Sequence, residues 1–261
     1  MILEYHRPTY LPEALELLNR DDPPTRPLAG GTILNQPTRE AMAVVDLQSL
    51  GLDHIERTGN NLRLGAMVRL QTLLETPGIS EGLKDTIRYE APINLRQAAT
   101  VAGSVAAGDG RSPFLAALLA LDAVLEIQHA TAPTTQIGIG DWLPLRGTRQ
   151  GELITAILLP LNAKVAYQYV ARTPADLAVI AVVAAQWPSS RTRLVVFGWG
   201  SIPMLAMDGP ESAGADSAAR NAASQASDAW ASSEYRQATA PILANRALHS
   251  IESKVYGGND G

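Results

Sequence analysis

The stretch Arg26-Pro27-Leu28-Ala29-Gly30-Gly31-Thr32-Ile33-Leu34 and the later stretch Ala99-Thr100-Val101-Ala102-Gly103-Ser104-Val105-Ala106 decide the expected fold. Each is predicted to be a loop that joins an extended segment to a bend. Because glycine has no Cβ, backbone N–H groups in such loops can converge on one point and hold a diphosphate without any lysine. A hydroxyl of Thr32 or Ser104 would add a donor. By themselves such glycines more often belong to ordinary turns than to a binding site.

The first fifty residues surround the first of these loops. Residues 11, 14, 15 and 18 are apolar at helical spacing, with acidic residues between them, which predicts an amphipathic helix over 10–18. Residues 43–47, which are apolar except for Asp46, indicate a buried strand. This part of the chain is therefore expected to be a small α/β unit.

The middle of the chain mixes strand and helix patterns. Residues 55–65 contain a Gly-Asn-Asn turn between two half-alternating runs, which predicts a β-hairpin. Helices are expected at 68–74, 79–89 and 114–121, and strands at 123–129, 134–139 and 152–159.

The last third predicts a small antiparallel sheet with a helix, from the segments 164–170, 177–187 and 193–199. Residues 208–229 are rich in Ala, Ser, Asp and Gly, and a final helix is expected from about 234 to 252.

Composition excludes several kinds of site. The 261 residues include 26 acidic and 21 basic side chains, a net charge of −5, so nucleic acid is not an expected partner. Without cysteine, this chain cannot itself hold Cys-ligated zinc or an iron–sulfur cluster. The four histidines lie far apart without metal-ligand spacing, so no metal site is expected: His6, His54, His129 and His249.

The sequence also bears on location. The longest apolar stretches, 114–121 and 177–185, fall well short of the ~20 residues that cross a membrane. The first eight residues carry no apolar run of the kind found in a signal peptide. We therefore expect a cytoplasmic chain with no membrane span.

Five separated stretches, in order and with matching spacing, are similar to those of a known family. The first three are Arg7-Pro8 together with residues 11–18, then Ala29-Gly30-Gly31-Thr32, then Leu64-Gly65-Ala66. The fourth is Leu95-Arg96 followed by Thr100-Val101-Ala102-Gly103-Ser104 and by residues 115–123. The fifth is Glu234-Tyr235-Arg236 followed by Arg246-Ala247-Leu248. On these stretches the chain resembles, nearly end to end, the FAD-binding medium subunit of the molybdenum hydroxylases, of the carbon monoxide dehydrogenase and xanthine dehydrogenase type.

The resemblance implies an α+β fold: a two-subdomain FAD-binding fold of the vanillyl-alcohol-oxidase/PCMH type, followed by a C-terminal domain with a small antiparallel sheet and helices. The implied FAD-binding domain covers residues 1–165, with a first α/β subdomain at 1–53 and a second subdomain at 54–165. The implied C-terminal flavoprotein domain covers residues 166–261. In this family FAD lies between the first two subdomains, and both glycine loops hold its pyrophosphate.

The implied function is that of an FAD-binding electron-transfer subunit of a multi-subunit molybdenum-containing hydroxylase or dehydrogenase, an oxidoreductase. The subunit would pass electrons from iron–sulfur clusters on a partner chain to an external acceptor, and substrate chemistry would occur on another chain, so no catalytic residue is expected here. The implied partners are an iron–sulfur small subunit with [2Fe–2S] clusters and a large subunit with the molybdenum cofactor, in a dimer of heterotrimers. The absence of cysteine agrees with this division.

Carried over position by position, the resemblance implies a set of FAD neighbours: Arg26, Leu28, Ala29, Gly30, Gly31, Thr32, Ile33, Leu34, Thr100, Gly103, Ser104, Asp109, Ile154 and Gln168. Ile154 matches a position that packs on the isoalloxazine ring. Asp109 is expected either to replace an aspartate that the family has where this chain has Pro113, or to contact the ribose.

The chain departs from the family pattern at several of these positions. Ile33 stands where a polar or acidic residue is common, Ala102 replaces a glycine, Ser104 replaces an asparagine and Gln168 replaces a lysine. Because most of these changes remove a polar or charged contact, FAD is expected to be weakly bound.

Two alternatives remain open. One is a flavin-less paralogue that keeps the fold as a structural or assembly subunit. The other is a free-standing flavoprotein that acts on its own substrate, for which the sequence supplies no general base near the glycine loops.

Overall fold

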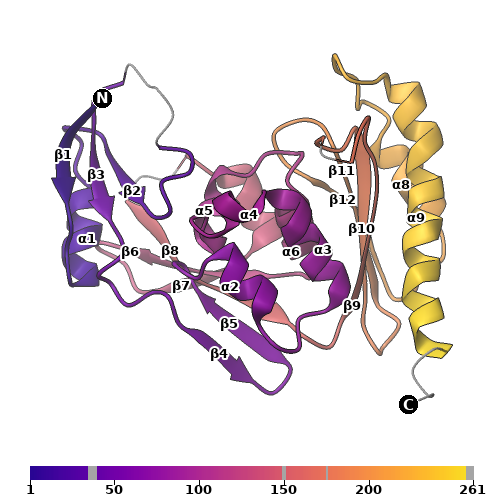
Figure 1. Cartoon of the computed structure of the whole chain (residues 1–261), viewed down its shortest axis with the longest axis horizontal. Helices are drawn as coiled ribbons and strands as arrows, with labels where there is room; N and C mark the ends of the chain where they lie inside the picture. Colours follow the sequence, from indigo (N-terminus) through magenta and orange to yellow (C-terminus); the bar gives the residue numbers. More distant parts are fainter. Residues whose placement is uncertain (35–39, 149–150, 175, 257–261) are drawn as a thin grey trace. The chain divides into compact units, whose positions relative to one another are not determined.

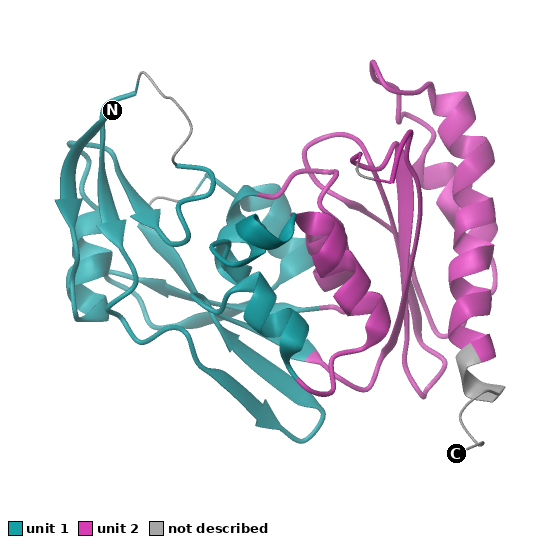
Figure 2. Ribbon diagram, viewed as in Figure 1, with its two compact units in different colours: residues 1–76, 92–107, 123–159 teal, residues 77–91, 108–122, 160–261 magenta. Residues whose placement is uncertain are grey.

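The computed structural model describes residues 1–34, 40–148, 151–174 and 176–256. The chain divides into two compact units, one of residues 1–76, 92–107 and 123–159 and the other of residues 77–91, 108–122 and 160–261 (Figure 2). The second unit thus includes two short segments, 77–91 and 108–122, that lie within the FAD-binding domain implied by the resemblance. The division into domains at residues 53 and 165 stays a prediction.

The first unit begins with a three-stranded parallel sheet in the order β1-β3-β2. Its strands are β1 (Ile2–His6), β2 (Thr25–Leu28) and the fully buried β3 (Met42–Asp46). Helix α1 (Leu11–Leu18) packs its apolar face on Val45 and Leu47 through Ala14, Leu15 and Leu18. The small α/β unit expected from the first fifty residues is confirmed.

A five-stranded sheet completes the first unit, in the order β4-β5-β8-β6-β7. Its strands are β4 (Ile55–Thr58), β5 (Asn61–Gly65), β6 (Val124–His129), β7 (Thr135–Gly138) and β8 (Glu152–Pro160). The β4–β5 hairpin, predicted from its Gly-Asn-Asn turn, has Gly59 at φ +58°, a conformation that favours glycine. The helical elements of this unit are α2 (Leu70–Glu75), α4 (Ile93–Arg96), α5 (Val101–Ala107), α7 (Ile139–Trp142) and the 3-10 turn η1 (Leu143–Leu145).

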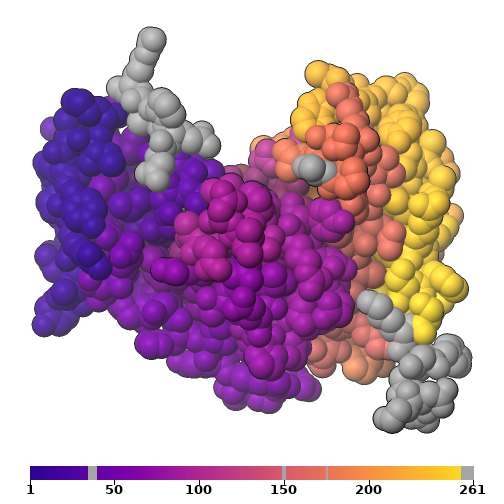
Figure 3. Space-filling view, viewed as in Figure 1, coloured from indigo at the N-terminus to yellow at the C-terminus, as the bar shows by residue number. Residues whose placement is uncertain are grey.

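The second unit is built on an antiparallel sheet in the order β12-β11-β10-β9. The strands are β9 (Lys164–Val170), β10 (Ile180–Gln186), β11 (Thr192–Phe197) and β12 (Met204–Gly209). Helices α3 (Glu81–Glu90) and α6 (Pro113–Ala120) cover one face, and α8 (Ala215–Ala222) and α9 (Ser233–Tyr256) cover the other (Figure 1). The long α9, yellow in Figure 3, lies directly against this sheet.

The two helical layers explain the apolar runs in the sequence. In β10, Ile180, Val182 and Ala184 pack with residues of α8 and α9, so the alternate residues face α3 and α6. A strand buried on both faces has no polar positions, which accounts for the unbroken apolar stretch. Helix α6 is buried along its whole length for the same reason. In the described ranges, no helix is both long and apolar enough to cross a membrane.

Most elements predicted from periodicity are present, with ends shifted by a few residues. One prediction is wrong: residues 99–106 are not a loop, because residues from Val101 onward form helix α5. The segment is short, and Gly103 with the β-branched Val101 and Val105 lowers its helix propensity, although Val101, Ala102 and Val105 form its buried face.

A buried arginine ties α9 to the rest of the second unit. Arg236 has no exposed surface. Its guanidinium donates to the carbonyl oxygens of Val179 at 2.9 Å, Ala226 at 2.7 Å and Ala231 at 3.2 Å. It also forms a two-pronged contact with both oxygens of Asp228, at 2.9 and 3.0 Å. A charge this deeply buried is tolerated because all of these acceptors surround it.

We expect Arg236→Met to lower the free energy of unfolding by about 3 kcal/mol, because three carbonyls and Asp228 lose their donor together. Urea unfolding followed by circular dichroism measures this. Arg246→Met, at an exposed position on the same helix, is the matched control and should change the value by less than about 0.5 kcal/mol. A loss below about 1 kcal/mol for Arg236→Met would contradict the role given to this arginine.

Candidate functional site

The first glycine segment leaves the sheet of the first unit in a tight turn. Strand β2 ends at Leu28, and the chain turns at Gly30 and Gly31. Gly31 has φ +68°, in the left-handed region that only glycine adopts without strain. Within the described part of the chain, no hydrogen bond uses the backbone N–H of Gly30, Gly31 or Thr32. These donors are therefore open to a ligand.

Gly30 brings this turn into backbone contact with the second glycine segment. A Cβ on Gly30 would lie 1.9 Å from the carbonyl oxygen of Ala98 and 2.7 Å from its carbonyl carbon. No side chain fits such a gap, so glycine is required here by the approach of one backbone to the other.

The second glycine segment is the start of a helix rather than a loop that offers donors. Thr100 caps it: its Oγ1 accepts from the N–H of Gly103 at 3.1 Å, and its carbonyl accepts from that of Ser104 at 2.9 Å. The N–H groups of Val101 and Ala102 donate to the carbonyls of Val68 and Ala66, at 2.8 and 3.3 Å. The expectation that N–H groups of this second segment converge on a diphosphate is therefore wrong.

The same helix explains one departure from the family pattern. Ala102 lies inside α5, and among the described residues the only non-glycine positions with positive φ are Asp122 and Ser190. Alanine at 102 thus has no conformational cost. Gly103 keeps the helix surface bare, since a Cβ there would come within 2.8 Å of Thr100 Oγ1.

A pocket of about 460 Å³ opens beside these two segments, entirely within the first unit. This volume is in the range of sites that bury small ligands. Its walls are Arg26, Pro27, Ala29, Gly30, Gly31, Thr32, Ile33, Leu34, Leu47, Ala66, Thr100, Ala102, Gly103, Ala106, Ala107, Ile127, Trp142, Glu152, Leu153 and Ile154. Most of these side chains are small or apolar, so a ligand here would meet flat apolar walls and exposed backbone.

Ten of the residues predicted as FAD neighbours line this pocket: Arg26, Ala29, Gly30, Gly31, Thr32, Ile33, Leu34, Thr100, Gly103 and Ile154. The structure therefore brings together positions that are more than a hundred residues apart in the sequence. Leu28 and Ser104 belong to the same unit, on β2 and α5, but do not line the pocket.

Asp109 and Gln168 lie in the second unit and are not among the pocket residues. Asp109 accepts the backbone N–H of Arg111 at 2.8 Å in its own turn. Gln168 lies on β9 opposite Val182 of β10. Their predicted roles as FAD neighbours stay predictions.

The proline at 113 has a structural explanation in the second unit. Pro113 is the first residue of α6, a position that favours proline, and Ser112 caps the helix by accepting from the N–H of Leu115 at 3.0 Å. The carboxylate of Glu90 adds to the cap by accepting from Ser112 Oγ at 2.7 Å and from the N–H of Phe114 at 3.0 Å. Burial, together with the charge of Asp109, raises the pKa of Glu90 above its ordinary value, against the lowering effect of these hydrogen bonds.

Sequence reasoning missed ten of the twenty pocket residues, and two of these have a large aromatic or a charged side chain. Trp142, buried at the end of α7, supplies an aromatic side chain to the pocket wall. Glu152, at the start of β8, supplies a carboxylate and lies 3.7 Å from His129 Nε2. Neither stands next to a glycine segment in the sequence, so no local signal could have pointed to them.

Charge in the pocket is sparse. Arg26 is its one cationic side chain in the described ranges; it is more than half exposed and lies 3.5 Å from Glu40. An anionic ligand would therefore depend on backbone N–H groups more than on charged side chains.

In this α+β fold the pocket combines open backbone N–H groups of the first glycine segment with apolar walls, as a site for an anionic ligand with apolar parts requires. The family model described as "FAD binding domain in molybdopterin dehydrogenase" matches residues 1–162, more than half of the chain. The chain belongs to this family, whose cofactor is FAD. The expected family and fold class are thereby confirmed.

Individual relatives agree with this assignment. The chain is 31% identical over 204 residues to the uncharacterized protein YgfM of Escherichia coli, covering 77% of this chain and 76% of that protein. It is 28% identical to the nicotine 6-hydroxylase medium subunit of Paenarthrobacter nicotinovorans, covering 94% of this chain and 96% of that subunit. A chain of the Cu,Mo-CO dehydrogenase in its cyanide-inactivated form has the same fold, with a TM-score of 0.82 at 24% identity, over 97% of this chain and 98% of that chain.

We expect Gly30→Ala to destabilise the first unit by about 1–3 kcal/mol without any ligand present, because the added methyl group forces the two backbones apart. Thermal or urea unfolding of the ligand-free protein measures the loss. Gly138→Ala is the matched control in the same unit, since Gly138 has φ −59° and its Cβ would meet only the end of the Asp141 side chain, at 3.3 Å. Equal stabilities of the two variants would show that the Gly30 contact is not a constraint.

Proposed function

We propose that this chain is the FAD-carrying medium subunit of a molybdenum-containing hydroxylase or dehydrogenase, and that it passes electrons from a partner chain to an external acceptor. The observation that carries the proposal is the pocket of the first unit, which lies within the family-matched residues and gathers ten of the predicted neighbours.

The residues of the pocket fit FAD. The free N–H groups of Gly30, Gly31 and Thr32 would hold the diphosphate, and the bare surface at Gly103 would let it approach the backbone. Apolar walls, including Trp142 and Ile154, would exclude water from the rings. When bound, FAD supplies the ability to take up and release electrons one or two at a time.

The chain's composition supports a division of labour with other subunits. Without cysteine it cannot hold an iron–sulfur cluster, and its described residues contain no group of ligands for a metal ion. We therefore assign the [2Fe–2S] clusters to a small partner subunit and the molybdenum cofactor to a large one, in a dimer of heterotrimers. The term "medium subunit" in the name of the nicotine 6-hydroxylase relative supports an assembly of this kind. A cytoplasmic location stays a prediction from the sequence.

FAD is proposed to be held weakly by the isolated chain. Ile33 lines the pocket and offers an apolar side chain where related chains commonly have a polar or acidic one. The second glycine segment offers no free N–H groups from 101 to 104. Each missing polar contact would weaken binding by roughly 0.5–1.5 kcal/mol.

Titration of the purified chain with FAD, followed by the visible absorption and fluorescence of the flavin, tests the proposal. We expect saturable binding of one FAD with a Kd in the micromolar range. A chain that binds no FAD at all would overturn the proposed function and favour the flavin-less subunit. Nanomolar binding would leave the function in place and contradict the weak binding.

A matched pair of glycine variants separates the binding site from general strain. Gly31 (φ +68°) and Gly51 (φ +67°) have the same backbone conformation in the same unit, but only Gly31 lines the pocket. Alanine at either position should cost about 1 kcal/mol of stability. We expect Gly31→Ala to weaken FAD binding about ten-fold or more, and Gly51→Ala to leave it unchanged.

The assembly has its own test. We expect the tagged chain, purified gently from its native host, to co-purify with a cysteine-rich small subunit and a large subunit that contains molybdenum. Mass spectrometry and metal analysis would detect these subunits. Recovery of this chain alone would contradict the proposed partners even if FAD binding is confirmed.

A further inference from the structure

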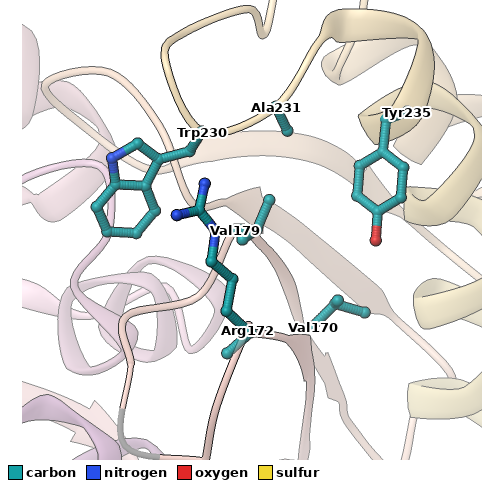
Figure 4. Close-up of a pocket in the computed structure, with 7 residues that line it drawn as sticks. Val170, Arg172, Val179, Trp230, Ala231 and Tyr235 are labelled. Atoms are coloured by element: carbon teal, nitrogen blue, oxygen red, sulfur yellow. The ribbon is translucent and has the colours of Figure 1, made fainter.

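We propose that the second unit carries a separate binding site for a small planar anion of the aromatic carboxylate type. The site is a cavity of about 310 Å³ next to the start of α9, and all of its walls belong to the second unit. They are Val170, Ala171, Arg172, Val179, Trp230, Ala231 and Tyr235 (Figure 4). The FAD pocket shares none of these residues.

The polar side chains of the cavity favour a ligand that accepts hydrogen bonds. Arg172 is exposed and, within the described ranges, makes no hydrogen bond and no ion pair. Figure 4 shows its guanidinium beside Trp230, with the Tyr235 ring on the other side of the cavity. The Tyr235 hydroxyl likewise has no partner within the part of the chain that the structure describes. No acidic side chain lines the cavity, so these donors are available to an anion.

The apolar side chains of the cavity favour an anion that also has a flat apolar part. Val170, at the end of β9, and Val179, just before β10, supply apolar wall, and Trp230, a residue that is 39% exposed, supplies an aromatic ring. An exposed tryptophan next to a free arginine is a combination typical of binding sites for planar ligands. The volume suits a one- or two-ring acid and is small for a larger cofactor.

The loop that presents Trp230 is held rigidly. Asp228 accepts from the backbone N–H of Trp230 at 2.8 Å and of Ala231 at 3.2 Å, and it is itself paired with Arg236 and, at 2.7 Å, with Arg111. Arg111 also lies over the Trp230 ring, with its guanidinium carbon 4.1 Å from the ring centroid. A ligand would therefore meet a preformed surface and would not need to order a loop.

The local charge also favours an anion. Arg111 and Arg236 share the single carboxylate of Asp228, and Arg172 adds a further positive charge. Arg172 lies farther from the Trp230 ring than Arg111, at 6.0 Å, so it can turn toward a ligand without giving up a close contact. A carboxylate paired with a guanidinium forms a charge-assisted hydrogen bond, which is stronger than the bond to a neutral amide of the same shape.

Calorimetric titration of the full chain with 2-naphthoate and with its neutral analogue 2-naphthamide tests the proposal, with FAD present in excess to occupy the pocket of the first unit. We expect one site for naphthoate, with at least about ten-fold preference over the amide. We expect Arg172→Gln to weaken naphthoate binding about ten-fold and to abolish the preference. Trp230→Leu should weaken both ligands, because the aromatic face is lost.

Arg220→Gln, at an exposed position on α8 in the same unit, is the matched control and should bind naphthoate as the unchanged protein does. Equal binding of acid and amide by the unchanged protein would overturn the proposal, as would naphthoate binding that Arg172→Gln does not alter. The result does not depend on the proposed function, because a chain that fails to bind FAD can still show or lack the Arg172-dependent preference.

Discussion

The contact between the backbones of Gly30 and Ala98 is the constraint on which the first unit depends. A Cβ atom added to Gly30 would lie only 1.9 Å from the Ala98 carbonyl oxygen, so the two main chains are in direct contact. One segment follows strand β2 and the other lies between helices α4 and α5, far apart in the sequence, so this contact fixes the position of the turn after β2 relative to α5. Two cavities adjoin this contact: the pocket of about 460 Å³ proposed for FAD, and a second one of about 540 Å³ that shares Ala29, Gly30 and Thr100 with it.

The two glycine segments have different structural roles, although their sequences are similar. In the first, Gly31 turns the chain through a left-handed conformation and leaves N–H groups open. In the second, Thr100 and the carbonyls of Val68 and Ala66 use the N–H groups, and glycine serves to keep a helix surface bare. Any anion at this site would therefore be held mainly from one side. That asymmetry is a physical reason for the weak FAD binding that we propose, and it adds to the effect of the residue changes.

The second unit is held together by polar contacts as well as by its apolar layers. Arg236 joins α9 to the segment before β10 and to the loop at 226–231, and the same loop presents Trp230 at the surface. The Glu-Tyr-Arg stretch that supports the family resemblance thus contains a buried structural residue and an exposed one side by side. Arg236 is turned inward and Tyr235 lines a cavity, because neighbouring residues on a helix point in different directions.

Local periodicity and backbone freedom predicted the order of most helices and strands and the positions of the glycine segments, and the family resemblance of the sequence predicted the α+β class. Ten of the predicted pocket residues could be named in advance because they lie in or beside those segments or match a family motif. Only the tertiary structure decided that residues 101–107 are helical, since their hydrogen-bond partners, such as Val68, come from elsewhere in the chain. It also decided that Trp142 and Glu152 complete the pocket, and that Ala102 and Pro113 fit as ordinary helix residues. These outcomes depend on contacts between distant segments, and such contacts leave no pattern in the local sequence.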